Sequence, residues 1–444
     1  MRTVPRLVLV LAVAAVCAAL AGQAAARPGA FAWTRTPDPG QGNDSLRLCA
    51  AGPSGSVYAA GSLGDYPDGD IWVVKYDATG AQVWSRTWAG PGGAYDEARG
   101  LVVDAAGDVY VCGQAGWEPD SGDSVLLKYD AAGTLAWATV YEAGEAADAA
   151  AAVGLDAAGA VYVAGQRSAG ASTYELYTAK FRAGDGGREW TAWYAGGSAT
   201  AGAIAVTPAG DCYVAGRSGG APTAGDALLV KTSAAGEQAW ARSWDGPAGR
   251  VDGWTCVQRA PGGGVVVAGT TDSTRRADFV AARYDDAGER AWLSTWSSPG
   301  RWYDELRDLA VAADGSVWAA GLTDRQEGDE RGALVKWSAA GRQLFARSLG
   351  TPRIAVYLSA VTVDAKGDAY VVGSVTSLGS GWDLLAAKYA KAGGRLWYTS
   401  SRIGTDSQDG LEAVALGGPG YVYACGTAGW EGPHARGVVV KIRR

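Results

Sequence analysis

The sequence predicts an all-β fold, an eight-bladed β-propeller of four-stranded blades that is closed into a ring by its N-terminal strand. Three recurring positions predict it. A glycine ends a Val- and Tyr-rich segment every 51 to 53 residues, at Gly61, Gly113, Gly165, Gly216, Gly269, Gly321, Gly373 and Gly426. A cation follows at Lys75, Lys128, Lys180, Lys231, Arg283, Lys336, Lys388 and Lys441. An aromatic residue follows the cation at Trp84, Trp137, Trp190, Trp240, Trp292, Phe345 and Trp397.

The second repeat shows the strands of one blade in order. Short apolar segments rich in Val, Tyr and Trp predict strands at 101–103, 109–113, 125–129 and 136–141. The phrase DAAG follows the first strand and also the third. Because Asp opens a type I turn and Gly takes the left-handed position after it, both segments predict tight turns. The recurring fourth-strand tryptophan is expected to pack between neighbouring blades.

The eighth aromatic residue stands near the front of the chain, in "FAWTRT" at 31–36. The same Trp-x-Arg-Ser/Thr phrase occurs in outer strands at 83–88 and 239–244, whereas the last repeat stops after its third strand at 437–444. We therefore expect 31–36 to complete the last blade, which also hides two sheet edges. This predicts a single propeller domain over 27–444. A seven-bladed variant and a linear β-solenoid are the alternatives.

Residues 1–26 predict a secretory signal peptide. Arg2 and Arg6 precede an apolar run at 7–20, and Ala24 to Ala26 offer a small-residue cleavage site. The run is shorter than the roughly 20 apolar residues that span a membrane. A membrane anchor and a lipoprotein anchor at Cys17 are the alternatives. The expected location is therefore secreted, either extracellular or at the cell surface, with no membrane span.

The charge of the chain restricts its partners. Without the two signal-peptide arginines, 37 basic residues face 46 acidic ones, a net charge of −9. An acidic chain without a basic stripe is a poor binder of nucleic acid or anionic membranes. A monomer that binds a protein or a glycan is expected instead.

Five cysteines remain beyond the signal peptide: Cys49, Cys112, Cys212, Cys256 and Cys425. An odd number leaves at least one unpaired within a monomer. In one interpretation they are small buried core residues. In the other, Cys212 pairs with Cys256 and Cys425 with Cys49, which leaves Cys112 free.

Three phrases resemble the bacterial secreted β-propeller-repeat (SBBP) proteins: "DAAGDVYVCG" at 104–113, "DAKGDAYVVG" at 364–373 and "LLKYDAAGTLAW" at 126–137. The resemblance covers 31–444 and implies an exported or surface interaction protein with no catalytic residue to carry over. The family name implies seven blades, whereas this chain has eight repeats. A second resemblance, to eight-bladed quinone-dependent dehydrogenases, rests on "DATGAQVW" at 77–84, which is one residue shorter than their motif. The adjacent cysteine pair of many such enzymes is absent.

Variable loops join the second strand to the third, and three of them meet in blades eight, one and two. "CGQAGWE" at 112–118 and "CGTAGWE" at 425–431 flank "SLGDYPDGD" at 62–70. Aromatic faces beside carboxylates suit a sugar, and an acidic loop suits Ca²⁺ as a possible cofactor. Local packing of duplicated loops is the alternative. The candidate ligand-binding residues are Trp117, Glu118, Trp430, Glu431, Asp65, Tyr66, Asp68 and Asp70.

An aspartate also recurs ahead of the first strand. The six residues are Asp44, Asp96, Asp148, Asp252, Asp304 and Asp409. We expect them at the channel mouth, where they either cap backbone donors or hold a cation.

Catalytic signatures are sparse. His434 is the only histidine, which excludes a multi-histidine zinc site and leaves a Ser-His-Asp triad no other centre. A glycosidase needs only two carboxylates, and no particular pair is indicated. The sequence therefore favours an exported, non-catalytic scaffold that binds a protein or glycan through its blade-crossover face. A glycoside hydrolase or lyase and a quinone-dependent dehydrogenase are the alternatives.

Overall fold

The computed structural model describes residues 27–37, 42–118, 121–141, 147–170, 173–219, 225–273, 276–300, 303–324, 330–351, 353–376, 381–403, 408–429 and 434–444. These ranges form the strands β1 to β32 and one 3-10 turn, η1 (Pro53–Gly55), and they contain no α-helix. None of their segments is a helix with the length and hydropathy needed to cross a membrane.

The strands group into four-strand units, which we number in chain order. Units 1 to 3 comprise β2 (Ser45–Ala51), β3 (Val57–Leu63), β4 (Asp70–Tyr76), β5 (Gln82–Trp88); β6 (Tyr95–Val103), β7 (Val109–Glu118), β8 (Ser121–Tyr129), β9 (Leu135–Tyr141); and β10 (Asp148–Leu155), β11 (Val161–Gly170), β12 (Thr173–Phe181), β13 (Arg188–Trp193). Units 4 and 5 comprise β14 (Ala199–Val206), β15 (Cys212–Ser218), β16 (Ala227–Thr232), β17 (Gln238–Trp244); and β18 (Asp252–Arg259), β19 (Val265–Ser273), β20 (Arg276–Tyr284), β21 (Arg290–Trp296). Units 6 to 8 comprise β22 (Tyr303–Val311), β23 (Val317–Asp324), β24 (Arg331–Trp337), β25 (Gln343–Leu349); β26 (Val356–Val363), β27 (Ala369–Thr376), β28 (Trp382–Tyr389), β29 (Arg395–Ser401); and β30 (Gly410–Leu416), β31 (Tyr421–Ala428), β32 (Arg436–Arg443) with β1 (Phe31–Arg35).

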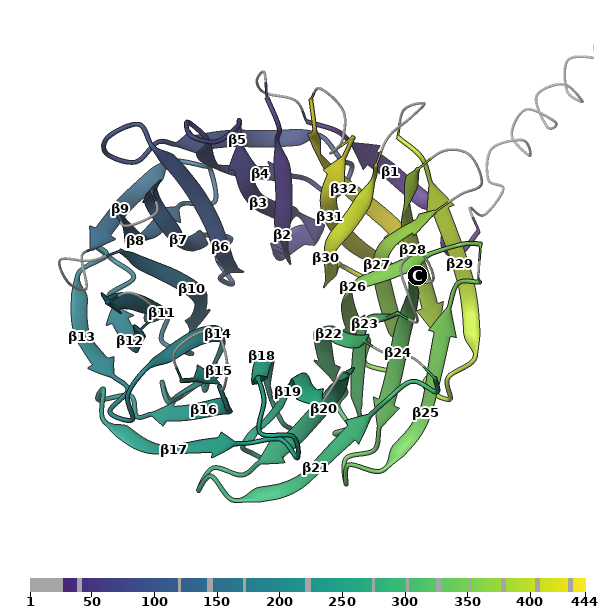
Figure 1. The fold of residues 1–444 in the computed structure, drawn as a ribbon. Coiled ribbons are helices and arrows are strands. Elements are labelled where there is room, and N and C mark those ends of the chain that lie inside the picture. The colour runs from purple at the N-terminus through teal and green to yellow at the C-terminus, as the bar shows by residue number, and fades with distance from the viewer. Residues whose placement is uncertain are drawn as a thin grey trace, which may run out of the picture.

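Each unit is an antiparallel meander, and the units are arranged around a central channel. The first strand of a unit lies innermost and the fourth outermost (Figure 1). Six units form separate four-stranded sheets, whereas units 5 and 6 share one eight-stranded sheet through a single parallel bridge, Ala277 to Tyr303. This arrangement is that of a β-propeller.

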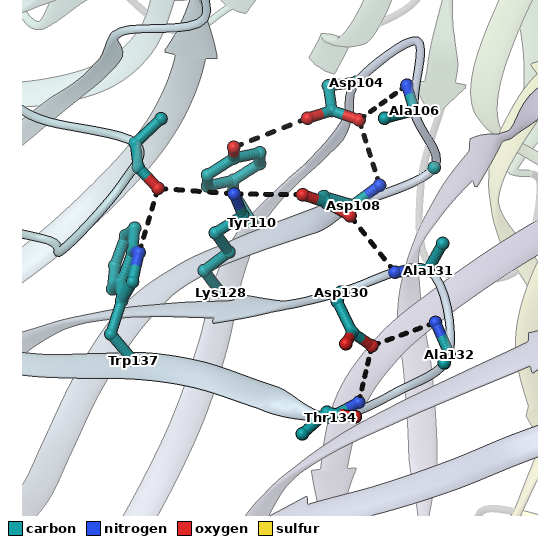
Figure 2. Close-up of polar contacts among 12 residues, drawn as sticks. Asp104, Ala106, Asp108, Tyr110, Lys128, Asp130, Ala131, Ala132, Thr134 and Trp137 are labelled. Carbon is teal, nitrogen blue, oxygen red and sulfur yellow. Dashed lines mark hydrogen bonds and ion pairs between the residues drawn. The ribbon is translucent and has the colours of Figure 1, made fainter.

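The predicted tight turns are present and have the predicted chemistry. In unit 2, the Asp104 carboxylate accepts hydrogen bonds from the amides of Ala106 and Asp108, both at 2.9 Å (Figure 2). Asp130 does the same for Ala132 at 2.9 Å and Thr134 at 2.8 Å. A short side chain thus replaces water as the partner of turn amides, which sharpens each strand reversal.

The hydrophobic core is divided among the interfaces between units. The described residues form eight buried clusters, each shared by two consecutive units, and one of them joins unit 8 to unit 1. The fourth-strand tryptophan packs there as predicted. Trp84 lies against Tyr58 of its own unit and Tyr129 of the next, with ring centroids 5.8 and 6.1 Å apart.

The same tryptophan also ties neighbouring units by a hydrogen bond. Trp137 Nε1 donates to the carbonyl of Ala183, in the turn between the last two strands of unit 3, at 3.0 Å. Lys128 Nζ donates to the same carbonyl at 3.3 Å and forms an ion pair with Asp108 at 2.9 Å (Figure 2). Two repeat positions that the sequence spaces nine residues apart therefore converge on one carbonyl of the next unit.

The N-terminal strand completes unit 8, as predicted. β1 pairs antiparallel with β32, with Trp33 opposite Lys441. Across the interface, Trp33 Nε1 and Lys441 Nζ both donate to the Ala78 carbonyl, at 3.4 and 2.6 Å. Arg35 Nε donates to the Gly80 carbonyl at 2.6 Å. We call this interface between units 8 and 1 the closure interface; it repeats the contacts made inside the ring.

One predicted cysteine pair is wrong. Cys212 Sγ contacts the Gly210 carbonyl at 3.6 Å, and Asp156 of unit 3 lies near enough to raise the pKa of its thiol. Cys256 Sγ contacts the Arg307 carbonyl of unit 6 at 3.5 Å. The two side chains therefore face away from each other. The five cysteines of the described residues are all thiols.

Candidate functional site

A cavity of about 610 Å³ lies at the inner edge of the ring, where the first strands of units 7, 8 and 1 begin. Its wall combines hydroxyl, carboxylate, guanidinium and phenol groups. The residues that line it with side-chain functional groups are Asn43, Asp44, Ser45, Arg47, Asp65, Tyr66, Tyr95, Glu97, Ser359, Ser374, Glu412 and Thr427.

A β-bulge in the first strand of every unit aims side chains at this inner surface. The register of each first strand skips one residue, at Arg47, Arg99, Ala151, Gly202, Thr255, Arg307, Ser359 and Glu412. A bulged residue leaves the alternation of the strand and re-aims its side chain. Three of these residues from consecutive units, Ser359, Glu412 and Arg47, line the cavity together.

The bulged residues make the inner surface electrically uneven. Units 1, 2, 6 and 8 place Arg or Glu at this position, whereas units 3, 4 and 5 place Ala151, Gly202 and Thr255. The cavity thus lies on the charged side of the ring. Sequence reasoning missed this position; its signal is the charged residue three places after the recurring aspartate, inside a strand that is otherwise apolar.

Arg47 bridges two carboxylates within the cavity. Its Nη1 lies 3.7 Å from Glu97 Oε1 and its Nε lies 3.6 Å from Glu412 Oε2. Burial raises the pKa of Glu412, and Arg47 together with a 3.3 Å hydrogen bond from Thr427 opposes that rise. The Arg47 side chain is 58% exposed, so these pairs are solvent-screened and contribute little to stability. A ligand can therefore displace Arg47 at low cost.

The structure brings two of the predicted loop residues, Asp65 and Tyr66, to the cavity. Asp65 accepts hydrogen bonds from Asn43 Nδ2 at 2.6 Å and from its amide at 3.3 Å. The exposed ring of Tyr66 lies 6.2 Å from the ring of Tyr95, at an angle of 52°. Two aromatic faces and a carboxylate thus stand at the cavity rim.

The other predicted loop residues lie away from that rim or outside the description. Asp68 is exposed and Asp70 begins β4, where burial raises the pKa of its carboxyl. The backbone of Trp117 pairs with Tyr95 and that of Glu118 with Ser121, while their side chains lie outside the described residues. Trp430 and Glu431 also lie outside the described residues. A Ca²⁺ site in the 62–70 loop stays a prediction; no group of three or more His, Cys, Asp or Glu suited to a metal occurs in the described ranges.

The six recurring aspartates are buried, each with at most 1% of its surface exposed: Asp44, Asp96, Asp148, Asp252, Asp304 and Asp409. Five of them have printed contacts to backbone amides, from Gly64, Gly116, Gly246, Ser298 and Gly429 respectively, at 2.6 to 3.1 Å. Some also hold the preceding crossover, as Asp409 does by accepting from the amide of Ile403 at 2.7 Å. Burial is the main cause that raises the pKa of Asp96 and of Asp252. These contacts are those of backbone caps that fix the loops around the cavity.

Comparisons with known proteins address the fold. No family model and no curated protein matches the sequence. Among solved structures, the chain is similar to Chaetomium thermophilum Sqt1 bound to the N-terminus of the ribosomal protein L10, with a TM-score of 0.58, 13% identity, and 91% of this chain and 98% of that chain covered. Sqt1 solved on its own gives a TM-score of 0.58 and 11% identity, and covers 94% of this chain and 99% of that one. At such low identity the similarity shows a shared fold. The chain is thus a repeat protein of the β-propeller class.

Proposed function

We propose that this chain is an exported, eight-bladed β-propeller that acts as a binding scaffold for a protein partner. Each four-strand unit is one blade, and the eight inter-unit clusters are the eight contacts of a closed ring. Residues 1–26 are the signal peptide and 27–444 the propeller domain. Export follows from the sequence of that N-terminal segment.

One observation carries the binding role: the cavity wall gathers charged and aromatic groups that the fold does not require. Equivalent bulged positions in units 3 to 5 hold Ala, Gly and Thr, and these units pair their strands in the same way. Arg47, Glu97 and Glu412 are therefore not needed for the strand register. Groups that stability does not require, gathered on one side of a rigid ring, are typical of recognition.

The chemistry of the wall favours a cationic group on the partner. Asp65, Glu97 and Glu412 supply carboxylate acceptors, and Tyr66 with Tyr95 offers ring faces to a cation. Arg47 occupies this place between the carboxylates, much as a partner's guanidinium would. We therefore propose a lysine or arginine side chain of a basic peptide segment as the anchor. The acidic charge of the chain would speed its encounter with such a segment.

The solved structure of Sqt1 supports the scaffold role by analogy, because that propeller-like chain was crystallised with the N-terminus of another protein. A glycan is the competing ligand, since the wall also carries the hydroxyls of Ser359, Ser374 and Thr427.

Binding measurements on residues 27–444 test the proposal. The protein is titrated with arrayed lysine- and arginine-rich peptides, with acidic peptides of equal length, and with a glycan array. We expect binding of basic peptides only, weakening as salt is raised. The double variant Tyr66→Ala with Glu412→Gln should weaken it at least tenfold, which is 1.4 kcal/mol or more.

Asp68→Asn is the matched control, since Asp68 is exposed in the same loop but does not line the cavity. Equal losses in both variants would reflect net charge alone and would contradict the site. Binding of glycans without basic peptides would replace the protein partner by a sugar.

A further inference from the structure

The interfaces between units contain one contact that repeats around the whole ring. A residue of the second strand, directly before the recurring glycine, packs in one cluster with a first-strand residue of the following unit. The pairs are Ala60 with Leu101, Cys112 with Val153, Ala164 with Ile204, Ala215 with Val257, Ala268 with Leu309, Ala320 with Val361, Val372 with Val414, and Cys425 with Cys49. Of these eight pairs, the one at the closure interface consists of two cysteines.

The two cysteines are in contact there. Cys425, on β31, is fully buried and its Sγ donates to the carbonyl of Leu48 at 3.2 Å. The thiols of Cys425 and Cys49 are themselves in hydrogen-bond contact. Cys49 lies on β2 and is half-exposed, so a reagent in solvent can reach it. Cys112, the other cysteine at this repeat position, packs against Val153 and has no thiol opposite it.

We infer that Cys49 and Cys425 form a disulfide that covalently links the first and the last unit of the ring. The bond forms by thiol–disulfide exchange with a disulfide-bonded donor, either glutathione disulfide or an oxidoreductase of the exported compartment. The oxidising compartment is the part of this inference that rests on the proposed function.

The exchange proceeds in two balanced steps. The Cys49 thiolate attacks one sulfur of the donor disulfide, which forms a mixed disulfide and releases the other donor sulfur as a thiolate. The Cys425 thiolate then attacks the Cys49 sulfur and releases the second donor thiolate. Two protons leave the cysteines, and the donor disulfide is reduced by two electrons to its dithiol.

The order of attack follows from burial. Burial raises the pKa of the Cys425 thiol well above its ordinary value, so its thiolate is scarce while the closure interface is intact. Cys49 is the more accessible sulfur and reacts first. The second step is fastest when the closure interface opens, so the bond forms most readily as the ring closes during folding.

The link encloses almost the whole propeller, because residues 49 and 425 lie 376 positions apart. A crosslink that closes so long a loop removes much of the freedom of the unfolded chain. For a chain of this length we expect the oxidised form to unfold about 7 °C higher than the reduced form.

Thiol counting and peptide mapping test the inference on the purified chain of residues 27–444. Reduced protein is refolded in a defined mixture of glutathione and glutathione disulfide, then denatured in acid, alkylated and digested. We expect a linked peptide that contains Cys49 and Cys425, and three alkylated cysteines instead of five. Five alkylated cysteines, or links among the other cysteines, would overturn the inference.

Protein recovered from an export-competent host separates the bond from the compartment. The same linked peptide in exported protein supports both statements. Its formation in glutathione buffer alone would contradict export through an oxidising compartment while the pairing stands. Its absence from both samples would overturn the pairing.

Variants add a readout that does not depend on mapping. Cys49→Ser should abolish the difference in unfolding temperature between oxidised and reduced protein, whereas Cys212→Ser should keep it. Cys212 is the matched control because it is fully buried and faces the opposite side of its unit. An unchanged difference in Cys49→Ser would contradict the proposed link.

Discussion

Removing residues 27–36 tests how the ring is held closed. The deletion takes away β1, and with it the Trp33 side chain, whose ring lies 5.9 Å from both Tyr76 of unit 1 and Tyr423 of unit 8. It also removes the 2.6 Å hydrogen bond from Arg35 Nε to the Gly80 carbonyl. The backbone of β32 from Val439 to Ile442 loses its strand partner.

The cost can be worked out from these contacts. Loss of a packed tryptophan costs about 3 kcal/mol or more, because it removes apolar contact and leaves a cavity. The charged hydrogen bond of Arg35 adds about 1 to 2 kcal/mol. Exposing one edge of β32 adds further to the loss. We therefore expect the free energy of unfolding to fall by at least about 5 kcal/mol, which is comparable to the whole stability of many domains.

Urea unfolding followed by far-UV circular dichroism measures this loss. Trp84→Ala is the internal comparison, since Trp84 has the same role between units 1 and 2, where the chain is continuous. A synthetic peptide of residues 27–36 should restore stability in trans, and the same peptide with Trp33→Ala should not. A deletion variant within about 1 kcal/mol of the full protein would refute the reasoning.

Three further predictions concern turns, a buried acid and the caps. Gly133→Ala should destabilise by about 2 kcal/mol or more, because φ is +84° and a Cβ would lie 2.6 Å from a packed tryptophan; Gly92→Ala, at φ +94° with open space around it, isolates the backbone part of that cost. Burial raises the pKa of Asp308 to about 7, so the unfolded chain loses this proton at lower pH than the folded one, and stability falls as pH rises from about 4 to 7; Asp308→Asn should flatten that fall in urea midpoints taken at pH 5 and pH 8. Asp96→Ala should lower the free energy of unfolding by about 2 to 3 kcal/mol by leaving two loop amides without their acceptor, and the exposed Asp68→Ala should change it by less than about 0.5 kcal/mol in the same urea titration.

The repeat positions predicted the fold well because each has one local cause. Asp and Gly in "DAAG" produce the turns wherever they occur, and the Trp-x-Arg phrase makes the same inter-unit contact at Trp33 as at Trp84. The displaced strand β1 could therefore be assigned to unit 8 from its sequence alone. Spacing is a reliable guide where the contact is the same in every unit.

The cysteine pairs show where sequence spacing stopped being sufficient. Cys425 lies one residue before its recurring glycine, whereas Cys212 lies four residues before Gly216. An offset of three positions turns a strand side chain to the opposite face. Cys256 likewise stands one position earlier in its strand than Cys49 does, directly after the bulge. Two pairs that look equivalent as strand-to-strand couplings therefore point in opposite directions.

The cavity could be predicted only in part. Asp65 and Tyr66 were found because they stand in a variable loop. Arg47 and Glu412 were missed because a bulge breaks the alternation, and strand patterns alone do not show which residue is skipped. The recurring aspartates were noticed as a charged series, but only the folded loops show that backbone amides surround them.

The two chain ends meet at a position that every other unit fills with a turn. The Gly29 amide donates to the Arg443 carbonyl at 2.9 Å, and the Arg443 amide donates to the Ala30 carbonyl at 3.1 Å. Gly29, at φ +83°, lies under Trp397 as Gly133 lies under Trp84. The ends thus form a cut turn, and the cut could stand in any unit. A circular permutant that joins them and opens between Asp130 and Gly133 should fold to the same ring, so the order of units along the gene is one of several equivalent ways to write this molecule.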